Sequence, residues 1–296
     1  MLKLAFRLPY DWTHVRDFLA ARAVPGVESV DERGYVRVVS SSGGPSIVCV
    51  RALQQENALE LRVRGAASAD LFQISAAARR VFDLASDPTQ IAACFAADDI
   101  LAPLVERRPG LRIPGAWDPF ECTVRAVLGQ QVSVAAGRTL AARLVARVGE
   151  PIDDGDGLTH AFPGPAALAS ANLDGLGIMG ARLAALRTLA RAVLDGALDF
   201  SASADAFSAR LASLPGFGPW TAQYVALRAL GDPDAFPSGD LVLRRMAGNG
   251  VPLTTRELER RAEAWRPWRG YAVMHLWRAA AEASSAPPPQ RSAGRT

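Results

Sequence analysis

Lysine and cysteine are both scarce in this chain of 296 residues. Lys3 is the only lysine among 33 lysine and arginine residues, so almost no side-chain amine is available for covalent chemistry. The three cysteines, Cys49, Cys94 and Cys122, form no Cys-x-x-Cys pair. Their number and spacing argue against a disulfide framework, a zinc site or a four-cysteine iron–sulfur cluster. We therefore expect a protein of a reducing compartment with no iron–sulfur cluster.

Long apolar runs are missing as well. The apolar run within residues 1–12 is too short for a signal peptide, and no stretch of the sequence reaches transmembrane length. We expect a soluble, cytoplasmic protein without a membrane partner. Apolar residues still make up 49% of the chain, which is enough to bury a core in one large domain or two ordinary ones. The net charge of +3 permits a nucleic-acid partner without requiring one.

Residues 1–88 have the pattern of a small α+β domain. Asp11 can cap a helix that runs to about Arg22, and a second helix is expected over 68–84. Strand-like runs separated by turn signals occur at 2–6, 27–30, 35–39, 47–52 and 59–63. These elements predict an antiparallel sheet with helices on one face.

Residues 89–284 show only helical patterns, interrupted by loops such as the polar, glycine-rich segment 151–164. One helix is expected over 91–107. Others are expected after the capping residues Asp118 and Ser133, and after the Thr254–Glu257 capping box. The segment 285–296 is of low complexity, and we expect it to be disordered.

The stretch 214–240, LPGFGPWTAQYVALRALGDPDAFPSGD, organises this helical region. Gly216 and Gly218 permit positive φ or a close backbone approach, so a tight hairpin is expected at 214–218. It joins two helices within a motif of about 207–230. A glycine-rich turn before a helix exposes amide groups that bind anions, most often phosphates. Trp220 and Tyr224 are four residues apart and share a helix face.

Two features of this region have ordinary structural explanations. Asp240 directly precedes an apolar run, a position where aspartate is favoured as a helix N-cap. A carboxylate held in this way could also take part in chemistry, because the two roles do not exclude each other. Gly175, Gly177 and Gly180 spell the dinucleotide-binding pattern Gly-x-Gly-x-x-Gly. The segment before them is helical and not a strand, so a helix–helix turn is the better interpretation.

The hairpin, the trailing aspartate and the segments PYDW, RPGLRIPG, RAVLGQQVSVA and WRPWRGYAVMHLW together resemble the helix-hairpin-helix DNA glycosylases, and within them the 3-methyladenine DNA glycosylase II (AlkA) group. The resemblance covers nearly all of residues 1–282. It implies an α+β fold whose N-terminal antiparallel sheet is followed by an all-α glycosylase region. Its implied partner is double-stranded DNA containing alkylated bases, bound by a monomer.

The resemblance also implies site residues. It makes Asp240 the catalytic carboxylate and Gln131 a wedge that enters the gap left by a flipped nucleotide. At positions that match the family's base pocket, this chain has the aromatic residues Phe18, Trp220, Tyr224 and Trp277. The resemblance implies that the amides of Gly216, Gly218 and Thr221 bind a DNA phosphate. It also implies that a monovalent cation, such as sodium or potassium, is held by the main-chain carbonyls of Ala212, Leu214 and Phe217. No cofactor is implied for the chemistry itself.

This sequence departs from the family pattern at three positions. Leu241 replaces a common aromatic residue, Gly239 replaces a second acidic residue, and Gln131 replaces an apolar wedge. Gln131 is alternatively an ordinary solvated loop residue.

The function implied is a monofunctional DNA N-glycosylase that excises alkylated bases. One alternative is a DNA-binding hairpin without chemistry, against which Asp240 and the surplus of pocket aromatics argue. The other is a bifunctional glycosylase/lyase, against which Trp220 argues, because such relatives carry a lysine at that position.

Overall fold

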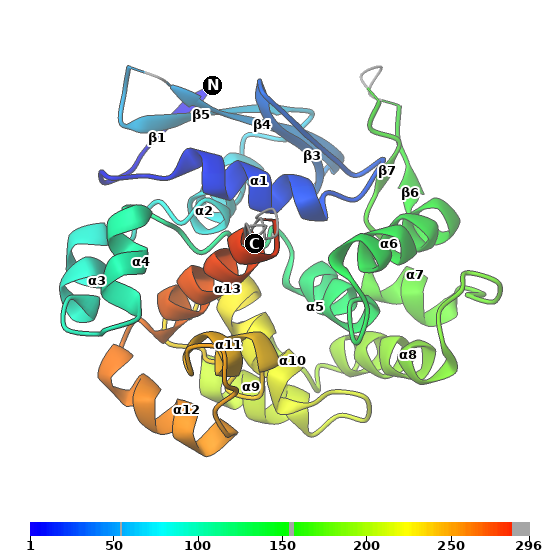
Figure 1. The fold of residues 1–296 in the computed structure, drawn as a ribbon. Coiled ribbons are helices and arrows are strands. Elements are labelled where there is room, and N and C mark those ends of the chain that lie inside the picture. Colours follow the sequence, from blue (N-terminus) through cyan, green and yellow to red (C-terminus); the bar gives the residue numbers. More distant parts are fainter. Residues whose placement is uncertain (54, 154–156, 286–296) are drawn as a thin grey trace, which may run out of the picture.

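A five-stranded antiparallel sheet forms the N-terminal part of the molecule. The computed structural model describes residues 1–53, 55–153 and 157–285 (Figure 1). The strands lie in the order β1-β5-β4-β3-β2, and each neighbouring pair is antiparallel. All five strand-like runs of the sequence are confirmed. The strands are β1 (Leu2–Ala5), β2 (Glu28–Asp31), β3 (Gly34–Ser41), β4 (Gly44–Leu53) and β5 (Ala58–Arg64).

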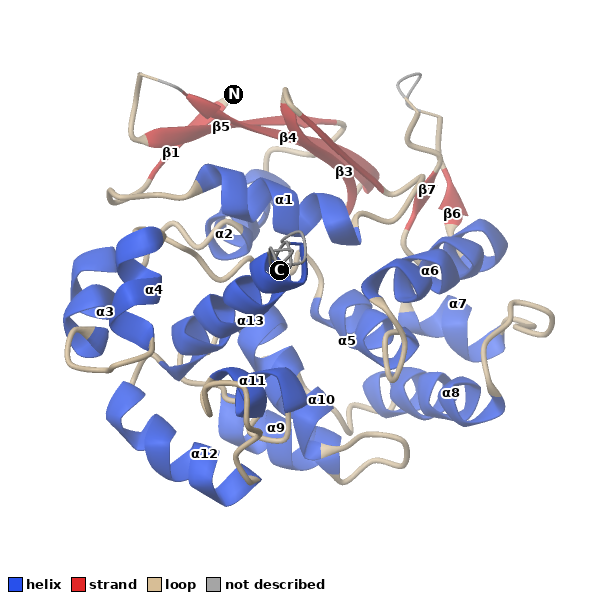
Figure 2. Cartoon of the chain, viewed as in Figure 1, coloured by secondary structure: helices blue, strands red, loops and turns tan. Residues whose placement is uncertain are grey.

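Two helices cover one face of this sheet, as predicted (Figure 2). Helix α1 (Trp12–Arg22) begins after Asp11, whose side chain accepts a hydrogen bond from the His14 amide at 2.9 Å. Helix α2 (Asp70–Val81) is shorter than the expected span 68–84. Both helices bury apolar side chains against the sheet, and their shared core includes Leu4, Leu19, Val48, Leu61 and Val81.

The rest of the described chain is mostly helical, as the sequence predicts. One packed group contains α5, α6, α8, α9 and α10, and a second contains α3, α4, α11, α12 and α13. The helices are α3 (Pro88–Phe95), α4 (Leu101–Arg107), α5 (Pro119–Leu128), α6 (Val134–Val148), α7 (Pro165–Ser170), α8 (Gly180–Leu194), α9 (Ala204–Ala212), α10 (Pro219–Val225) with a π-helical continuation over Ala226–Leu230, α11 (Leu241–Met246), α12 (Thr255–Ala262) with a 3₁₀ turn over Glu263–Trp265, and α13 (Arg269–Ser285).

The prediction of one helix over 91–107 is wrong, because two helices, α3 and α4, occupy this span. Asp98 lies between them, and its Oδ1 accepts hydrogen bonds from the amides of Ile100 and Leu101, both at 2.9 Å. Its Oδ2 accepts a third from Trp265 Nε1 at 2.7 Å. A side chain that satisfies the first free amides of α4 starts a new helix, which the apolar periodicity alone did not indicate.

The expectation of helices only beyond the sheet is also corrected. Strands β6 (Glu150–Pro151) and β7 (His160–Ala161) pair within the segment read as a polar loop. The Gly26 carbonyl accepts hydrogen bonds from the Thr159 and His160 amides at 2.8 and 3.1 Å, which attaches this arm to the N-terminal domain. Long-range contacts therefore hold β7 against the N-terminal domain, although the composition around it is that of a loop.

Helix α13 ends the described part of the chain, and the tail expected to be disordered lies outside it apart from Ser285. Across the three described ranges, no helix combines the length and the apolar character needed to cross a membrane. In the Gly175–Gly180 motif, Gly175 and Gly177 lie between α7 and α8 with φ of +77° each, and Gly180 is the first residue of α8. A helix–helix turn is thus the correct interpretation of that motif.

Candidate active site

The hairpin between α9 and α10 contains two glycines, and the geometry of the chain requires only the first of them. Gly216 has φ of +91°, and a Cβ there would lie 2.6 Å from the Cβ of Ala185 in α8, so no larger residue fits. Gly218 caps α10 with φ of −107°, and a Cβ there would meet nothing within 4 Å. The chain itself therefore does not demand glycine at 218, which leaves open space in front of the helix.

The backbone of the hairpin has groups available for ligands. Within the described residues, the amides of Gly216, Gly218 and Thr221 donate no hydrogen bond to a main-chain carbonyl. They lie at the N-terminal end of a helix, where amide groups attract anions. This is the property that the sequence predicts for them.

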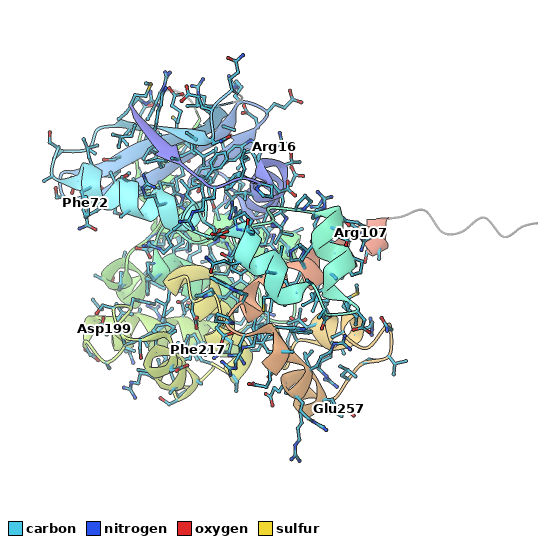
Figure 3. The ribbon with its side chains drawn as sticks, turned by 90° about the vertical axis from the view of Figure 1, so that its left-hand side faces the viewer. Arg16, Phe72, Arg107, Asp199, Phe217 and Glu257 are labelled. Carbon is cyan, nitrogen blue, oxygen red and sulfur yellow. The ribbon has the colours of Figure 1, made fainter. Side chains whose placement is uncertain are left out.

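The three carbonyls that the sequence implies as cation ligands flank the same turn. The Leu214 carbonyl accepts the Phe217 amide at 3.2 Å, and those of Ala212 and Phe217 accept no main-chain amide from the described residues. The Phe217 ring itself is buried among the helices, away from the sheet (Figure 3). Hard oxygen donors of this kind suit a monovalent cation, so the residues present fit such an ion.

Gln130, which the sequence analysis did not single out, joins the break between α5 and α6 to the hairpin. Its Nε2 lies 3.2 Å from the Gly216 carbonyl and 3.3 Å from the Thr221 hydroxyl. Its own carbonyl accepts a hydrogen bond from Arg182 in α8. The pattern Gly-Gln-Gln drew attention to residue 131, but nothing local in the sequence indicates a contact 86 positions away.

Gln131 lies at the tip of this break, as expected from the sequence. It is exposed and has φ of +56°, in the left-handed region that few residues other than glycine adopt. Its neighbours Val132 and Val134 are also exposed. An exposed side chain flanked by exposed apolar residues is what the predicted wedge requires.

Three of the four predicted pocket aromatics come together at one cavity of about 920 Å³. Trp220 and Tyr224 of α10 stack with ring centroids 5.3 Å apart and an interplanar angle of 11°. Trp277 of α13 lies 6.2 Å from Tyr224 at 46°. These rings form a wall on which a planar base can stack.

Phe18, the fourth predicted aromatic, is not among the residues that line this cavity. The guanidinium carbons of Arg22 and Arg228 lie 3.7 and 4.4 Å from the centre of its ring. Phe18 therefore supports two arginines, each of which does line the cavity. The sequence analysis identified neither arginine, because arginine is so common in this chain that no local pattern distinguishes these two.

Asp240 lies at the rim of the aromatic wall and uses both of its carboxylate oxygens. Oδ1 accepts a hydrogen bond from the Leu243 amide at 3.0 Å, which makes Asp240 the N-cap of α11. Oδ2 accepts a hydrogen bond from the Trp220 indole nitrogen at 2.9 Å. The N-cap interpretation is confirmed. The second bond joins Asp240 to the cavity, because it fixes the carboxylate against one of the stacked rings.

The two departures beside Asp240 leave this edge of the cavity open. Leu241 is exposed, and a Cβ at Gly239 would meet nothing within 4 Å. Where the family commonly has an aromatic residue, Leu241 is a smaller side chain and covers less of the cavity edge. It lies next to Val242, which lines the cavity.

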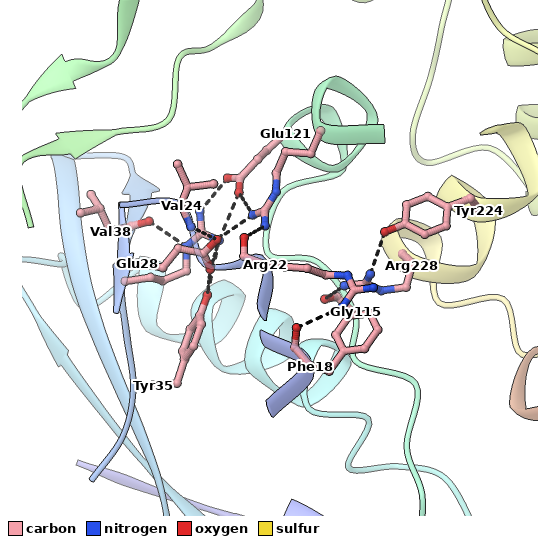
Figure 4. A network of polar contacts seen from close by, with 12 residues as sticks. Phe18, Arg22, Val24, Glu28, Tyr35, Val38, Gly115, Glu121, Tyr224 and Arg228 are labelled. Atoms are coloured by element: carbon pink, nitrogen blue, oxygen red, sulfur yellow. Dashed lines mark hydrogen bonds and ion pairs between the residues drawn. The ribbon is translucent and has the colours of Figure 1, made fainter. Parts of the chain in front are cut away.

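A buried cluster of charges fixes the inner end of the cavity. Arg37 of β3 bonds Glu121 of α5 at 2.6 Å, and Arg125 bonds Glu28 and Glu121 at 2.7 and 2.8 Å (Figure 4). Burial alone raises the pKa of Glu28, but Arg125, Arg37 and the Tyr35 hydroxyl hold it below its usual value. The cluster thereby joins the sheet to α5 with paired charges.

Comparisons with known proteins agree with this geometry. The sequence matches two protein-family models. The AlkA N-terminal domain family matches residues 1–118, and the family described as HhH-GPD superfamily base excision DNA repair protein matches residues 124–269. DNA-3-methyladenine glycosylase 2 of Escherichia coli (strain K12) is 37% identical over 283 residues, covering 94% of this chain and 96% of that protein.

A second relative is longer than this chain. The probable bifunctional transcriptional activator/DNA repair enzyme AlkA of Mycobacterium tuberculosis (strain ATCC 25618 / H37Rv) is 41% identical over 93% of this chain, which spans 56% of that protein's length. Among solved structures, a 3-methyladenine DNA glycosylase from Archaeoglobus fulgidus superposes with a TM-score of 0.84 at 21% identity, covering 97% of this chain and 100% of that one. This last likeness shows a shared fold.

Proposed function

The chain belongs to the HhH-GPD superfamily of base excision DNA repair proteins and carries an AlkA-type N-terminal domain, and on this premise we propose that it is a monofunctional DNA N-glycosylase that excises alkylated bases. The observation that carries the proposal is the double anchorage of Asp240, by Trp220 and by the start of α11, at the rim of an aromatic cavity. The proposed substrate is double-stranded DNA with a damaged base, and the enzyme acts as a cytoplasmic monomer.

Binding begins at the sugar–phosphate backbone. The free amides of the hairpin, at Gly216, Gly218 and Thr221, hold one phosphate, and surface arginines hold others. The carbonyls of Ala212, Leu214 and Phe217 hold a monovalent cation that keeps the turn rigid and adds positive charge beside that phosphate. Contacts of this type give an affinity that falls with salt and depends little on sequence.

The damaged nucleotide then leaves the helix and enters the cavity. Its base stacks on the wall of Trp220, Tyr224 and Trp277, while Gln131 fills the gap in the duplex. Electron-rich rings attract a base that carries positive charge, and tryptophan does so best. Stacking therefore favours methylated purines.

Cleavage requires one carboxylate. The bond between C1′ and the base breaks with its electron pair moving to the base, and positive charge develops on the sugar. The negative charge of Asp240 stabilises that sugar cation and orients the water, which adds to C1′ as its proton passes to the Asp240 carboxylate. A methylated base that was cationic leaves as a neutral molecule, so no general acid is needed.

The test is to incubate the purified protein with methylated DNA and to identify the released free bases by chromatography. The proposal expects free methylated purines and an intact, abasic strand. The matched sample uses Asp240→Asn, which is expected to release none. Release of no base by the parent protein, under conditions where it binds the DNA, contradicts the proposed function.

A further inference from the structure

Two positive charges lie at the floor of a cavity that is proposed to receive cationic bases. Arg22 of α1 and Arg228 of the π-helical turn pack on the same ring, that of Phe18, and both line the cavity (Figure 4). A cationic base on the Tyr224 ring meets them closely, since the guanidinium carbon of Arg228 is 5.7 Å from that ring's centre. Like charges at this distance repel in a partly buried site.

The other charges at the inner end of the cavity do not offset these two. Glu28 and Glu121 are bonded to Arg37 and Arg125, so the negative charges there already have partners. The third carboxylate of the cavity lining, Asp240, lies at the rim. The floor of the cavity next to Tyr224 therefore carries net positive charge. A site that binds only cationic bases has no need of this positive charge.

The two arginines differ in how many of their donors are in use. Arg228 is buried, and its guanidinium bonds the carbonyls of Pro114 and Gly115 and the hydroxyl of Tyr224. Arg22 is half-buried, and its Nη1 donates to the Phe18 carbonyl one turn earlier at 3.4 Å. A guanidinium has five N–H donors, and with Tyr224 as a second partner Arg22 still has donors left for a ligand.

Arg22 is also fixed in place. Its own carbonyl accepts a hydrogen bond from Arg125 of the buried charge cluster, and its guanidinium carbon lies over the Phe18 ring, 3.7 Å from the ring centre. Burial lowers its pKa to about 10, so it remains charged at neutral pH. A planar, rigid donor of this kind is suited to a carbonyl oxygen on a planar base.

We propose that Arg22 is a specificity-determining residue that favours flipped bases which are neutral and carry a carbonyl acceptor over bases with a positively charged ring. The inference rests on the proposed glycosylase function and deepens it. Its chemical reason lies in the leaving group. When the bond to C1′ breaks, a neutral base receives the electron pair and becomes negative until it is protonated, whereas a cationic base becomes neutral.

A guanidinium bonded to the acceptor stabilises that developing negative charge, so Arg22 helps the poorer leaving group. The cationic bases leave readily without it and tolerate its repulsion. One cavity can thereby process two classes of lesion with opposite charge requirements. Its aromatic rings attract cationic bases, and the arginines at its floor stabilise the negative charge that develops on neutral, carbonyl-bearing bases. Deaminated purines such as hypoxanthine belong to the second class, and 7-methylguanine belongs to the first.

The experiment measures single-turnover excision from two duplexes that differ only in the lesion, 7-methylguanine or hypoxanthine. In Arg22→Leu we expect the ratio of the hypoxanthine rate to the 7-methylguanine rate to fall at least about tenfold, the scale of one lost hydrogen bond to a charged group. Arg22→Lys retains the charge without the planar fork, and an intermediate ratio is expected. This second variant keeps the test informative if the leucine variant folds poorly.

Arg16→Leu is the matched control, because it removes an arginine from the same helix that does not line the cavity and is paired with Asp17. Its ratio is expected to equal that of the parent. The inference is overturned if Arg22→Leu and Arg22→Lys change both rates by the same factor, or if the parent excises 7-methylguanine and not hypoxanthine. Excision of neither base by the parent instead contradicts the proposed function itself, and the inference with it.

Discussion

The indole nitrogen of Trp220 donates a hydrogen bond to Oδ2 of Asp240 at 2.9 Å, while the ring of the same residue stacks on Tyr224. One side chain thus both forms the wall of the cavity and orients the carboxylate at its rim. In the proposed reaction, a single rigid residue would therefore set the distance between a stacked base and Asp240, as a reaction at C1′ requires.

Asp240→Asn is expected to abolish base release while binding to abasic DNA persists. Asparagine has one acceptor oxygen where aspartate uses two, so it cannot both cap α11 and accept the Trp220 indole proton. The loss of one hydrogen bond lowers the free energy of unfolding by about 1 kcal/mol. Urea unfolding and single-turnover excision measure the two effects. Release of methylated bases at the parent rate means that Asp240 is not catalytic.

The protein is expected to leave abasic strands uncut and to form no covalent adduct with DNA under borohydride. A lyase needs an amine nucleophile, and the only lysine, Lys3, lies in β1 and pairs with Glu56 at 2.9 Å. Trp220→Lys places an amine next to Asp240 and serves as the positive comparison. A stable cross-link in the parent protein overturns the monofunctional assignment.

Gln130→Glu is expected to weaken both DNA binding and excision by about tenfold, because the charged side chain cannot donate to the Gly216 carbonyl. The break between α5 and α6 at Gln131 then loses its fixed position relative to the hairpin at Gly216. Gln130→Met, of similar size and without donors, should behave in the same way. The control is Gln90→Met, which removes an exposed glutamine from α3. Parent-like affinity in both Gln130 variants shows that the contact has no role in binding.

The rim of the cavity was predictable from local signals, because helix capping places Asp240 at the start of α11 and a spacing of four aligns Trp220 with Tyr224. The catalytic role of Asp240 is implied by the resemblance to the glycosylases and stays a prediction. The fold class was also predictable from local signals, since alternation and capping residues mark each strand and most helices. The pocket floor was not predictable: Phe18 and Arg228 are brought together by tertiary packing across 210 positions, and one arginine among so many has no distinguishing pattern. The β6–β7 arm also depends on distant contacts, with Gly26.

Acid is expected to destabilise the protein between about pH 6.5 and pH 4. Burial lowers the pKa of His14 to about 4 and that of His275 to about 3, so the unfolded chain binds protons in this range that the folded chain does not. Asp83, whose pKa burial raises to about 6, acts in the opposite direction below pH 6, as do Asp118 and Asp232, whose pKa burial also raises. The two histidines act together with carboxyls whose pKa is held low by their partners, such as Glu28 and Asp98, so we expect the free energy of unfolding to fall as the pH falls.

Urea unfolding at several pH values checks this expectation. His275→Leu removes one of the titrating groups from the core, where its ring contacts Phe95. The dependence of the free energy of unfolding on pH should become shallower by up to about 1.4 kcal/mol per pH unit, the value for one proton. An unchanged dependence in the variant means that His275 does not drive the acid effect.

Gln131 is expected to act as the wedge, although its side chain is polar. It projects from the break between α5 and α6 with φ of +56°, beside the exposed Val132 and Val134. Its amide can fill the gap left by a flipped nucleotide and bond the unpaired base opposite, but it offers less apolar surface for stacking than leucine does. Gln131→Ala should therefore lose at least about fivefold in affinity for a stable abasic analogue relative to undamaged duplex. Gln131→Leu should keep or raise excision of methylated purines.

The left-handed backbone provides the control for this experiment. Alanine and leucine are strained at positive φ in the same way as glutamine, so differences among these three come from the side chain. Gln131→Gly relaxes the backbone without supplying a wedge. If glycine and alanine lose the same preference for the abasic analogue at one fixed salt concentration, the side chain is responsible. A preference equal to that of the parent in all three variants makes Gln131 an ordinary solvated loop residue.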